Sequence, residues 1–178
     1  MTPAELKNLV RTVPDFPQPG ILFRDITTLI GHGAGLAAAV GHLAERARKS
    51  DVAYVAGIEA RGFIFGAAVA AQLGAGFVPL RKPGKLPVAA IGVDYALEYG
   101  TDRLEMDPGA LPSGAKVALI DDLIATGGTA HAAAALLRQA GALVEHAQFV
   151  IDLPDLGGAD RLRAAGIAVA SLMAFPGH

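Results

Sequence analysis

The sequence contains no cysteine and no tryptophan, and only 6% of its residues are aromatic. Without cysteine, a disulfide framework and a zinc site built from thiolates are both excluded. Charge is also scarce, because Asp, Glu, Lys and Arg make up 18% of the 178 residues, with a net charge of -2 and a sequence pI near 6.2. Proteins that coat nucleic acid or anionic membranes are usually basic. We therefore expect neither as a partner.

One long stretch, residues 62–80, has no charged side chain at all. A membrane-spanning helix needs about 20 apolar residues. Gly74, Gly76 and Pro79 interrupt this stretch, so it is expected to form a helix and then a strand rather than a membrane span. Residues 1–11 carry charges of both signs and lack the apolar segment of a secretory signal. We expect a cytoplasmic protein.

Short apolar runs alternate with helical patterns along most of the chain. The runs predict buried strands at 53–58, 77–80, 116–120, 143–151 and 167–172. Apolar spacing predicts helices over 3–12, 35–49, 62–73, 129–140 and 156–165. Alternating strands and helices are typical of a parallel sheet with right-handed crossovers. We predict one α/β domain over residues 1–178, with a central parallel sheet flanked by helices.

Two segments do not follow this alternation. Residues 13–20 contain three prolines and a glycine, which prevent regular structure there. The same region carries Phe16, Leu22 and Phe23, which we expect to be buried, either around a pocket or in a lid packed on the core. Residues 83–106 mix prolines, glycines, tyrosines and scattered charge. This composition predicts a flexible excursion or a hairpin outside the core.

Polar residues gather where the third predicted strand ends, which is where ligands bind in parallel sheets. Asp121 and Asp122 follow that strand, and residues 125–129, Ala-Thr-Gly-Gly-Thr, open the next helix. Glycines let the backbone approach a ligand, and N–H groups at a helix start bind anions. Two adjacent carboxylates need hydroxyl donors or a cation. A sugar phosphate meets both needs; the alternative is an ordinary capped helix with an acidic turn.

Cations follow two other predicted strands. Arg61 lies in a turn between Gly57 and Gly62, and Arg81, Lys82 and Lys85 form a basic turn after residues 77–80. A salt-bridged turn and a solvated basic turn are the alternatives at these two places. Taken with the acidic strand end, the cations favour a ligand that has a phosphate, a diol and further negative charge. Phosphoribosyl pyrophosphate has that layout.

Other patterns carry no functional prediction. Residues 31–35, Gly-His-Gly-Ala-Gly, are similar to a dinucleotide-binding fingerprint, but no strand precedes them, so a loop before a helix is expected. The five histidines lack the spacing of a metal motif, and none is assigned as a ligand.

Residues 117–129 resemble the phosphoribosyl pyrophosphate motif of the type I phosphoribosyltransferases. Residues 16–26, 57–65 with 81–87, and 97–100 resemble segments of the adenine-specific branch of that family, and 175–178 resembles its bacterial members. The resemblance spans nearly the whole chain in the family's order. It implies a type I phosphoribosyltransferase-like fold with a small hood. It also implies transfer of the 5-phosphoribosyl group from phosphoribosyl pyrophosphate to adenine, which gives AMP and pyrophosphate in purine salvage.

The resemblance further implies a homodimer and a requirement for Mg²⁺. The metal is expected to bind mainly through phosphoribosyl pyrophosphate rather than through direct protein ligands, with Asp121 or Asp122 reaching it through water. Glu98, Tyr99 and Arg61 are the candidate catalytic residues, and Glu98 is the acid/base candidate. Glu98 and Tyr99 lie on the hood, at about 83–106.

The resemblance also assigns the parts of the ligand to residues. The 5′-phosphate is expected at Ala125, Thr126, Gly127, Gly128 and Thr129, and the ribose hydroxyls at Asp121 and Asp122. The pyrophosphate is expected to face Arg61, Arg81, Lys82 and Lys85, some of them reaching across from a partner subunit. Adenine is expected in the loop at about 13–26, against Leu22, Phe23 and Arg24, with Leu123 packing on its ring.

Two alternatives remain open. A related transferase that acts on hypoxanthine, guanine or xanthine would share the sugar-phosphate site, and residues 16–26 are what favours adenine. A non-enzymatic regulator of the same fold would bind nucleic acid through an added segment or a basic face. The net negative charge disfavours that reading.

Overall fold

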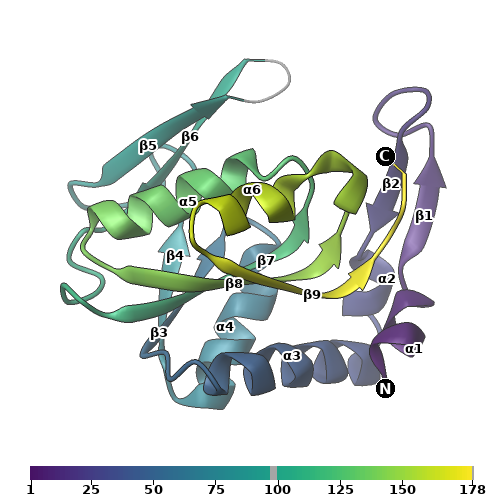
Figure 1. Cartoon of the computed structure of the whole chain (residues 1–178), viewed down its shortest axis with the longest axis horizontal. Helices are drawn as coiled ribbons and strands as arrows, with labels where there is room; N and C mark the ends of the chain where they lie inside the picture. Colours follow the sequence, from purple (N-terminus) through teal and green to yellow (C-terminus); the bar gives the residue numbers. More distant parts are fainter. Residues whose placement is uncertain (97–99, 178) are drawn as a thin grey trace.

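The computed structural model describes residues 1–96 and 100–177. Its centre is a five-stranded sheet in the order β4-β3-β7-β8-β9 (Figure 1). The strands are β3 (Tyr54–Ile58), β4 (Gly76–Leu80), β7 (Lys116–Ile124), β8 (Leu143–Asp152) and β9 (Ala168–Ala174). Every neighbouring pair in this sheet is parallel. The predicted parallel sheet is confirmed.

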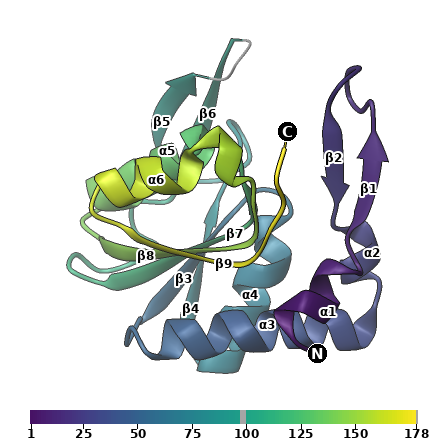
Figure 2. The ribbon, with the colours of Figure 1, turned by 45° about the vertical axis from the view of Figure 1, so that its right-hand side comes forward.

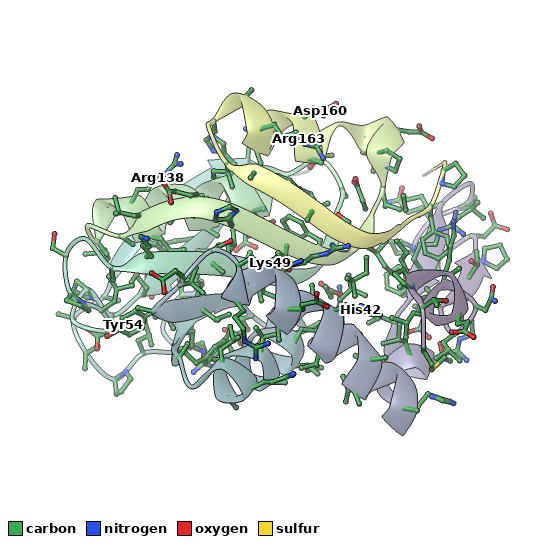
Figure 3. The ribbon with its side chains drawn as sticks, turned by 60° about the horizontal axis from the view of Figure 1, so that its bottom comes forward. His42, Lys49, Tyr54, Arg138, Asp160 and Arg163 are labelled. Carbon is green, nitrogen blue, oxygen red and sulfur yellow. The ribbon has the colours of Figure 1, made fainter. Side chains whose placement is uncertain are left out.

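Helices cover both faces of the sheet, as Figure 1 shows. On one face lie α3 (Gly33–Arg48) and α4 (Gly62–Leu73), and on the other lie α5 (Gly128–Gln139) and α6 (Gly158–Ala164). A short 3-10 helix, η1 (Pro154–Leu156), precedes α6. Seen from the α3 side in Figure 3, His42 and Lys49 lie along α3, whereas Asp160 and Arg163 lie on α6 beyond the sheet.

The two faces explain why the strands read as continuous apolar runs. In β3, Val55 belongs to the core that α3 and α4 cover, whereas Ala56 and Ile58 belong to the core that α5 covers. Successive side chains of a strand point to opposite faces, so a strand buried on both sides has no polar alternation.

The charge-free residues 62–80 divide into α4 and β4, as predicted. Gly74 ends α4 with a φ of 68°, a left-handed conformation that glycine adopts without a side-chain clash. No described helix combines the length and apolarity that crossing a membrane requires. The loop predicted over residues 31–35 is confirmed only for Gly31 and His32, because α3 already begins at Gly33; the His32 Nδ1 accepts a hydrogen bond from the Gly35 N–H at 3.0 Å.

The N-terminal region corrects one prediction. The helix expected over 3–12 is α1 (Pro3–Lys7), and it is followed by an antiparallel hairpin of β1 (Arg11–Pro14) and β2 (Leu22–Asp25), then by α2 (Thr27–Ile30). Pairing with β2 and the Arg11–Asp25 ion pair outweigh the local helical pattern.

The apolar side chains of this hairpin are not all buried, which corrects a second prediction. Phe16 is 52% exposed and Leu22 is 38% exposed. Phe16 packs edge-on against Phe23, with ring centroids 5.2 Å apart. In Figure 2 the hairpin stands apart from the sheet, so its tip has little of this chain to pack against.

Residues 83–106 contain a second hairpin, formed by β5 (Ile91–Ala96) and β6 (Thr101–Met106). A hairpin was one of the two predictions for this segment. The expectation that this segment lies outside the core is wrong, because Leu104 and Met106 are fully buried. A pair of backbone hydrogen bonds between Arg81 and Glu105, each 2.8 Å, ties its base to the end of β4.

Candidate active site

A cavity of about 280 Å³ opens at the carboxyl ends of β3 and β7. It is lined by residues 58–61, by Lys82 and by residues 121–130. The cavity therefore brings together Arg61, the paired aspartates and the glycine loop, residues 125–129. The sequence alone had placed these features at the ends of separate strands. Such a position at the sheet edge is where α/β proteins bind ligands.

The paired aspartates lie inside β7 rather than after it, which corrects the predicted strand end. The strand runs on to Ile124 because its last residues pair with β8, Leu123 opposite Ile151 and Ile124 opposite Asp152. The acids are thus held by backbone hydrogen bonding on the sheet, a more rigid setting than a turn.

Asp121 lies against the start of α4. A Cβ atom added at Gly62 would come within 2.6 Å of the Asp121 Oδ1, so a side chain at this position would displace the Asp121 carboxyl group. The Asp122 N–H donates to the same Oδ1 at 2.9 Å. Burial raises the pKa of Asp121 well above its ordinary range, and the neighbouring Asp122 carboxylate adds to this. Asp121 therefore holds a proton more tightly than an exposed aspartate does.

Asp122 has a different partner. Its carboxylate is buried and accepts a hydrogen bond from the Arg61 guanidinium in an ion pair, whereas the Arg61 side chain is 55% exposed. Burial lowers the pKa of Arg61, but the charge and the hydrogen bond of Asp122, together with the charges of Asp121 and Asp25, more than offset it, so that the pKa is raised. Arg61 is thereby both a paired cation and a side chain that reaches the open cavity.

The glycine loop, residues 125–129, is held by its backbone. Gly127 precedes α5 with a φ of 79°, and a Cβ atom there would lie 2.9 Å from the Gly158 backbone. The Gly158 N–H donates to the Ala125 carbonyl at 3.0 Å. The loop is thus packed on the start of α6, and it presents the first N–H groups of α5 toward the cavity, an arrangement that suits an anion.

The basic turn, residues 81–85, is tied to its neighbours by carboxylates. Glu59 accepts from the Lys82 N–H at 2.8 Å and from the Arg81 Nε at 3.2 Å, and these bonds lower the pKa of Glu59. The Lys82 ammonium bonds to Tyr95 and Asp102. Of the cations in this turn, Lys82 lines the cavity, while Arg81 and Lys85 lie outside its lining. A freely solvated basic turn is therefore not what the structure contains.

The residues predicted for the base lie elsewhere. Leu22, Phe23 and Arg24 are on β2 and do not line the cavity, whereas Leu123 does. The Arg24 guanidinium donates to the Pro176 carbonyl at 3.1 Å and lies 4.8 Å from the centroid of the Phe175 ring. Figure 2 shows this hairpin on the side of the molecule opposite β5 and β6. Glu98 and Tyr99 lie outside the described residues.

Comparisons with known proteins agree with this geometry. The phosphoribosyl transferase domain family matches residues 28–160. A curated adenine phosphoribosyltransferase from Novosphingobium aromaticivorans is 70% identical over 178 residues, which is 100% of both chains. The chain belongs to the adenine phosphoribosyltransferase family. The prediction drawn from residues 117–129 and the three further segments is confirmed.

Solved structures of adenine phosphoribosyltransferases share the fold. The crystal structure from Thermoanaerobacter pseudethanolicus superposes with a TM-score of 0.92 at 42% identity, covering 98% of this chain and 100% of that chain. The enzyme from Saccharomyces cerevisiae, crystallised with adenine and an imino-altritol bisphosphate, superposes with a TM-score of 0.89 at 38% identity, covering 96% of this chain and 98% of that chain. The type I phosphoribosyltransferase-like fold is confirmed.

The donor set of the cavity fits the magnesium ion that the family implies. Mg²⁺ prefers oxygen ligands and usually keeps water and substrate phosphates in its shell. Asp121 and Asp122 supply carboxylate oxygens at the cavity wall. Within residues 1–96 and 100–177, no three acidic or histidine side chains converge as a metal cage would require. The cavity therefore suits an ion that is held largely by water and by the substrate.

Sequence reasoning missed four residues around this site: Glu59, Tyr95, Asp102 and Gly158. Each acts on a partner more than a dozen residues away, such as Gly158 on Gly127 or Glu59 on Lys82. The turn containing Glu59 was recognised as charged, but only its arginine was given a role. An acidic residue directly after a buried strand is the signal that could have identified Glu59.

Proposed function

We propose that the protein catalyses, in this cavity, the transfer of the 5-phosphoribosyl group from phosphoribosyl pyrophosphate to adenine, which forms AMP and releases pyrophosphate. The observation that carries this proposal is the meeting of three features in one cavity: the glycine loop, two adjacent carboxylates and the cations Arg61 and Lys82. A phosphate, a diol and a pyrophosphate are the groups that these features bind best. Membership of the adenine phosphoribosyltransferase family supports adenine as the acceptor.

The binding roles follow from this layout. The N–H groups and hydroxyls of Ala125, Thr126, Gly127, Gly128 and Thr129 hold the 5′-phosphate. Asp121 and Asp122 accept hydrogen bonds from the ribose hydroxyls. Arg61 and Lys82 face the pyrophosphate from the cavity wall, and Arg81 and Lys85 act on it from further out or across a subunit boundary. Leu123 packs on the adenine ring, which the backbone of Leu22, Phe23 and Arg24 recognises.

The reaction replaces one bond at the ribose C1′ with another. Adenine N9 forms a bond to C1′, the bond from C1′ to the pyrophosphate oxygen breaks, and its electron pair leaves with the pyrophosphate. Arg61 and Lys82 stabilise the negative charge that develops on the leaving group. Mg²⁺, held near Asp121 and Asp122 through water, supplies further positive charge to the phosphate oxygens when it is bound.

Glu98 and Tyr99 complete the proposed set of catalytic residues with Arg61. Glu98 takes up the proton that N9 loses, a role worth about 10²- to 10⁴-fold in rate. Closure of the hood, at about 83–106, excludes water and so protects the activated sugar from hydrolysis. A Glu98→Gln variant with the wild-type kcat for AMP synthesis would remove Glu98 from this role.

A panel of bases tests the reaction. The protein is incubated with phosphoribosyl pyrophosphate, Mg²⁺ and either adenine, hypoxanthine, guanine or xanthine, and nucleotides are separated by chromatography. We expect AMP and pyrophosphate in equal amounts, and no product when EDTA replaces Mg²⁺. Formation of IMP, GMP or XMP without AMP would assign the chain to another base.

We further propose a cytoplasmic homodimer in which each chain is one domain over 1–178, with a purine loop at about 13–26. The outer face of α4 supports the dimer, because Ile64 is 39% exposed and no charged residue occurs in 62–80. Light scattering should give twice the chain mass of 18.1 kDa. A monomer at micromolar concentration would reject the dimer, and two separate calorimetric transitions would reject the single domain.

A further inference from the structure

Three of the cations at or beside the cavity are paired with carboxylates. Arg61 pairs with Asp122, Arg81 with Glu59, and Lys82 with Asp102. Asp122 and Glu59 are themselves part of the cavity wall, but Asp102 belongs to β6 and lies outside the lining. Lys82 is thus the cation whose carboxylate partner lies outside the cavity wall.

The contacts of Lys82 form a closed triangle. Its ammonium donates to the Tyr95 hydroxyl at 3.1 Å and pairs with the Asp102 carboxylate, and the Tyr95 hydroxyl donates to the same carboxylate at 3.0 Å. The backbone of Lys82 stays fixed by Glu59. Lys82 is therefore held both at its backbone, by Glu59, and at its ammonium group, by Tyr95 and Asp102.

We propose that Asp102 and Tyr95 are positioning residues that restrain Lys82 until pyrophosphate takes their place. The inference rests on the proposed function, because it needs pyrophosphate in the cavity beside Lys82. It adds two residues that the sequence did not single out.

Charge and geometry support an exchange. An ammonium group has three N–H donors, and the triangle uses two of them on residues that do not line the cavity. Pairing with Asp102 also cancels the charge that Lys82 would present to an anion. Pyrophosphate carries several negative charges and Asp102 carries one, so the ammonium favours pyrophosphate when it is present and Asp102 when it is absent.

The hairpin holds both partners of Lys82 in place. Tyr95 and Asp102 are directly opposite each other in the β5–β6 ladder. The base of the hairpin is tied to the end of β4 by the paired backbone hydrogen bonds between Arg81 and Glu105. Tyr95 and Asp102 therefore reach Lys82 from one position of a ladder that is attached beside it.

The same hairpin offers a matched control. Asp94 and Arg103 form an ion pair at 3.0 Å one position along the ladder, and Asp94 has no contact with Lys82. Asp94→Asn and Asp102→Asn each remove one negative charge and one ion pair from the hairpin. A difference between them reports the contact with Lys82.

The experiment measures inhibition of AMP synthesis by added pyrophosphate, with Mg²⁺ present throughout. Because the Lys82–Asp102 pair is partly exposed, we expect Asp102→Asn to lower the inhibition constant about five-fold. Tyr95→Phe should lower it less, since it removes a neutral hydrogen bond, and Asp94→Asn should leave it within two-fold. An unchanged or raised constant in Asp102→Asn and Tyr95→Phe would overturn the restraint.

A double variant separates this role from a structural one. In a Lys82→Met background, Asp102→Asn should no longer change the inhibition constant, because the residue acts through Lys82. A drop in the inhibition constant that persists without the Lys82 ammonium would overturn the restraint. A wild type that makes no AMP would reject the proposed function instead.

Discussion

The glycine loop and the basic turn both face the cavity, but they are built in opposite ways. The glycine loop is set by backbone contacts within one sheet-and-helix unit, such as Gly127 against Gly158. The basic turn depends on side-chain ion pairs to other elements, such as Lys82 with Asp102. Backbone packing fixes a geometry, whereas partly exposed ion pairs can exchange partners at little cost. The site thus combines a rigid glycine loop with an adjustable set of cations.

The largest effect is expected from a substitution that distorts the rigid glycine loop. Gly127→Ala places a Cβ atom 2.9 Å from the Gly158 backbone at a φ of 79°. We expect kcat/KM for phosphoribosyl pyrophosphate to fall at least about 100-fold, since misplacing a binding group by 1 Å costs that much. Gly84→Ala is the control, because Gly84 has a φ of 73° in the basic turn with open space around it. Steady-state kinetics in which both variants lose activity equally would contradict the comparison.

A smaller effect is expected in the adjustable half. Lys82→Ala should raise KM for phosphoribosyl pyrophosphate about ten-fold, the value of one charge-assisted hydrogen bond. KM for adenine should stay unchanged. The ten-fold difference should also shrink as salt rises, because the pair is partly exposed. A salt-independent loss would show that Lys82 is held as rigidly as the glycine loop.

The N-terminal hairpin should behave as a third, separate part. Arg24→Ala removes the contacts to Phe175 and Pro176 that hold β2. We expect KM for adenine to rise about three- to five-fold, a value typical of a partly exposed cation–π contact with one hydrogen bond. KM for phosphoribosyl pyrophosphate should not change. Equal changes in both constants would mean that the hairpin and the cavity act as one unit.

The smallest effect concerns stability rather than activity. The pKa of Asp121 is raised in the folded protein, which therefore binds the proton of this carboxyl group more tightly than the unfolded chain does. In an unfolded chain the pKa of an aspartate is about 3.9. Stability should therefore fall as pH rises from about 4 through the folded-state pKa. Asp121→Asn should abolish that slope and raise the melting temperature at pH 7 by a few degrees. Thermal unfolding between pH 4 and 8 measures both changes, and a lower melting temperature at pH 7 would contradict the assignment.

Local patterns in the sequence predict the parallel sheet and the glycine loop well, because both depend on neighbouring residues. Apolar runs report strands buried on two faces, and a double glycine before a helix reports an anion-binding start. The end of β7 could not be predicted in this way, because its last residues are held by pairing with β8. The β1–β2 hairpin was missed for the same reason, since pairing between distant residues replaced a local helical pattern.

The contacts that position the cations were also hidden from the sequence. Asp102 lies 20 residues from Lys82, and Glu59 lies 23 residues from it. Asp102 carries no local signal that distinguishes it from an ordinary surface carboxylate, and the place of Glu59 directly after a buried strand does not reveal its partner. Only the folded arrangement of β3, β4 and β6 brings these three residues together.

The anchoring of Arg24 by Pro176 has a consequence for synthesis on the ribosome. The two residues are 152 positions apart, so β2 is translated long before the segment that holds its guanidinium. Translation adds about 5–20 residues per second. A nascent chain therefore carries the hairpin without its C-terminal support for several seconds, and the β1–β2 hairpin acquires that support only after the glycine loop has already been made.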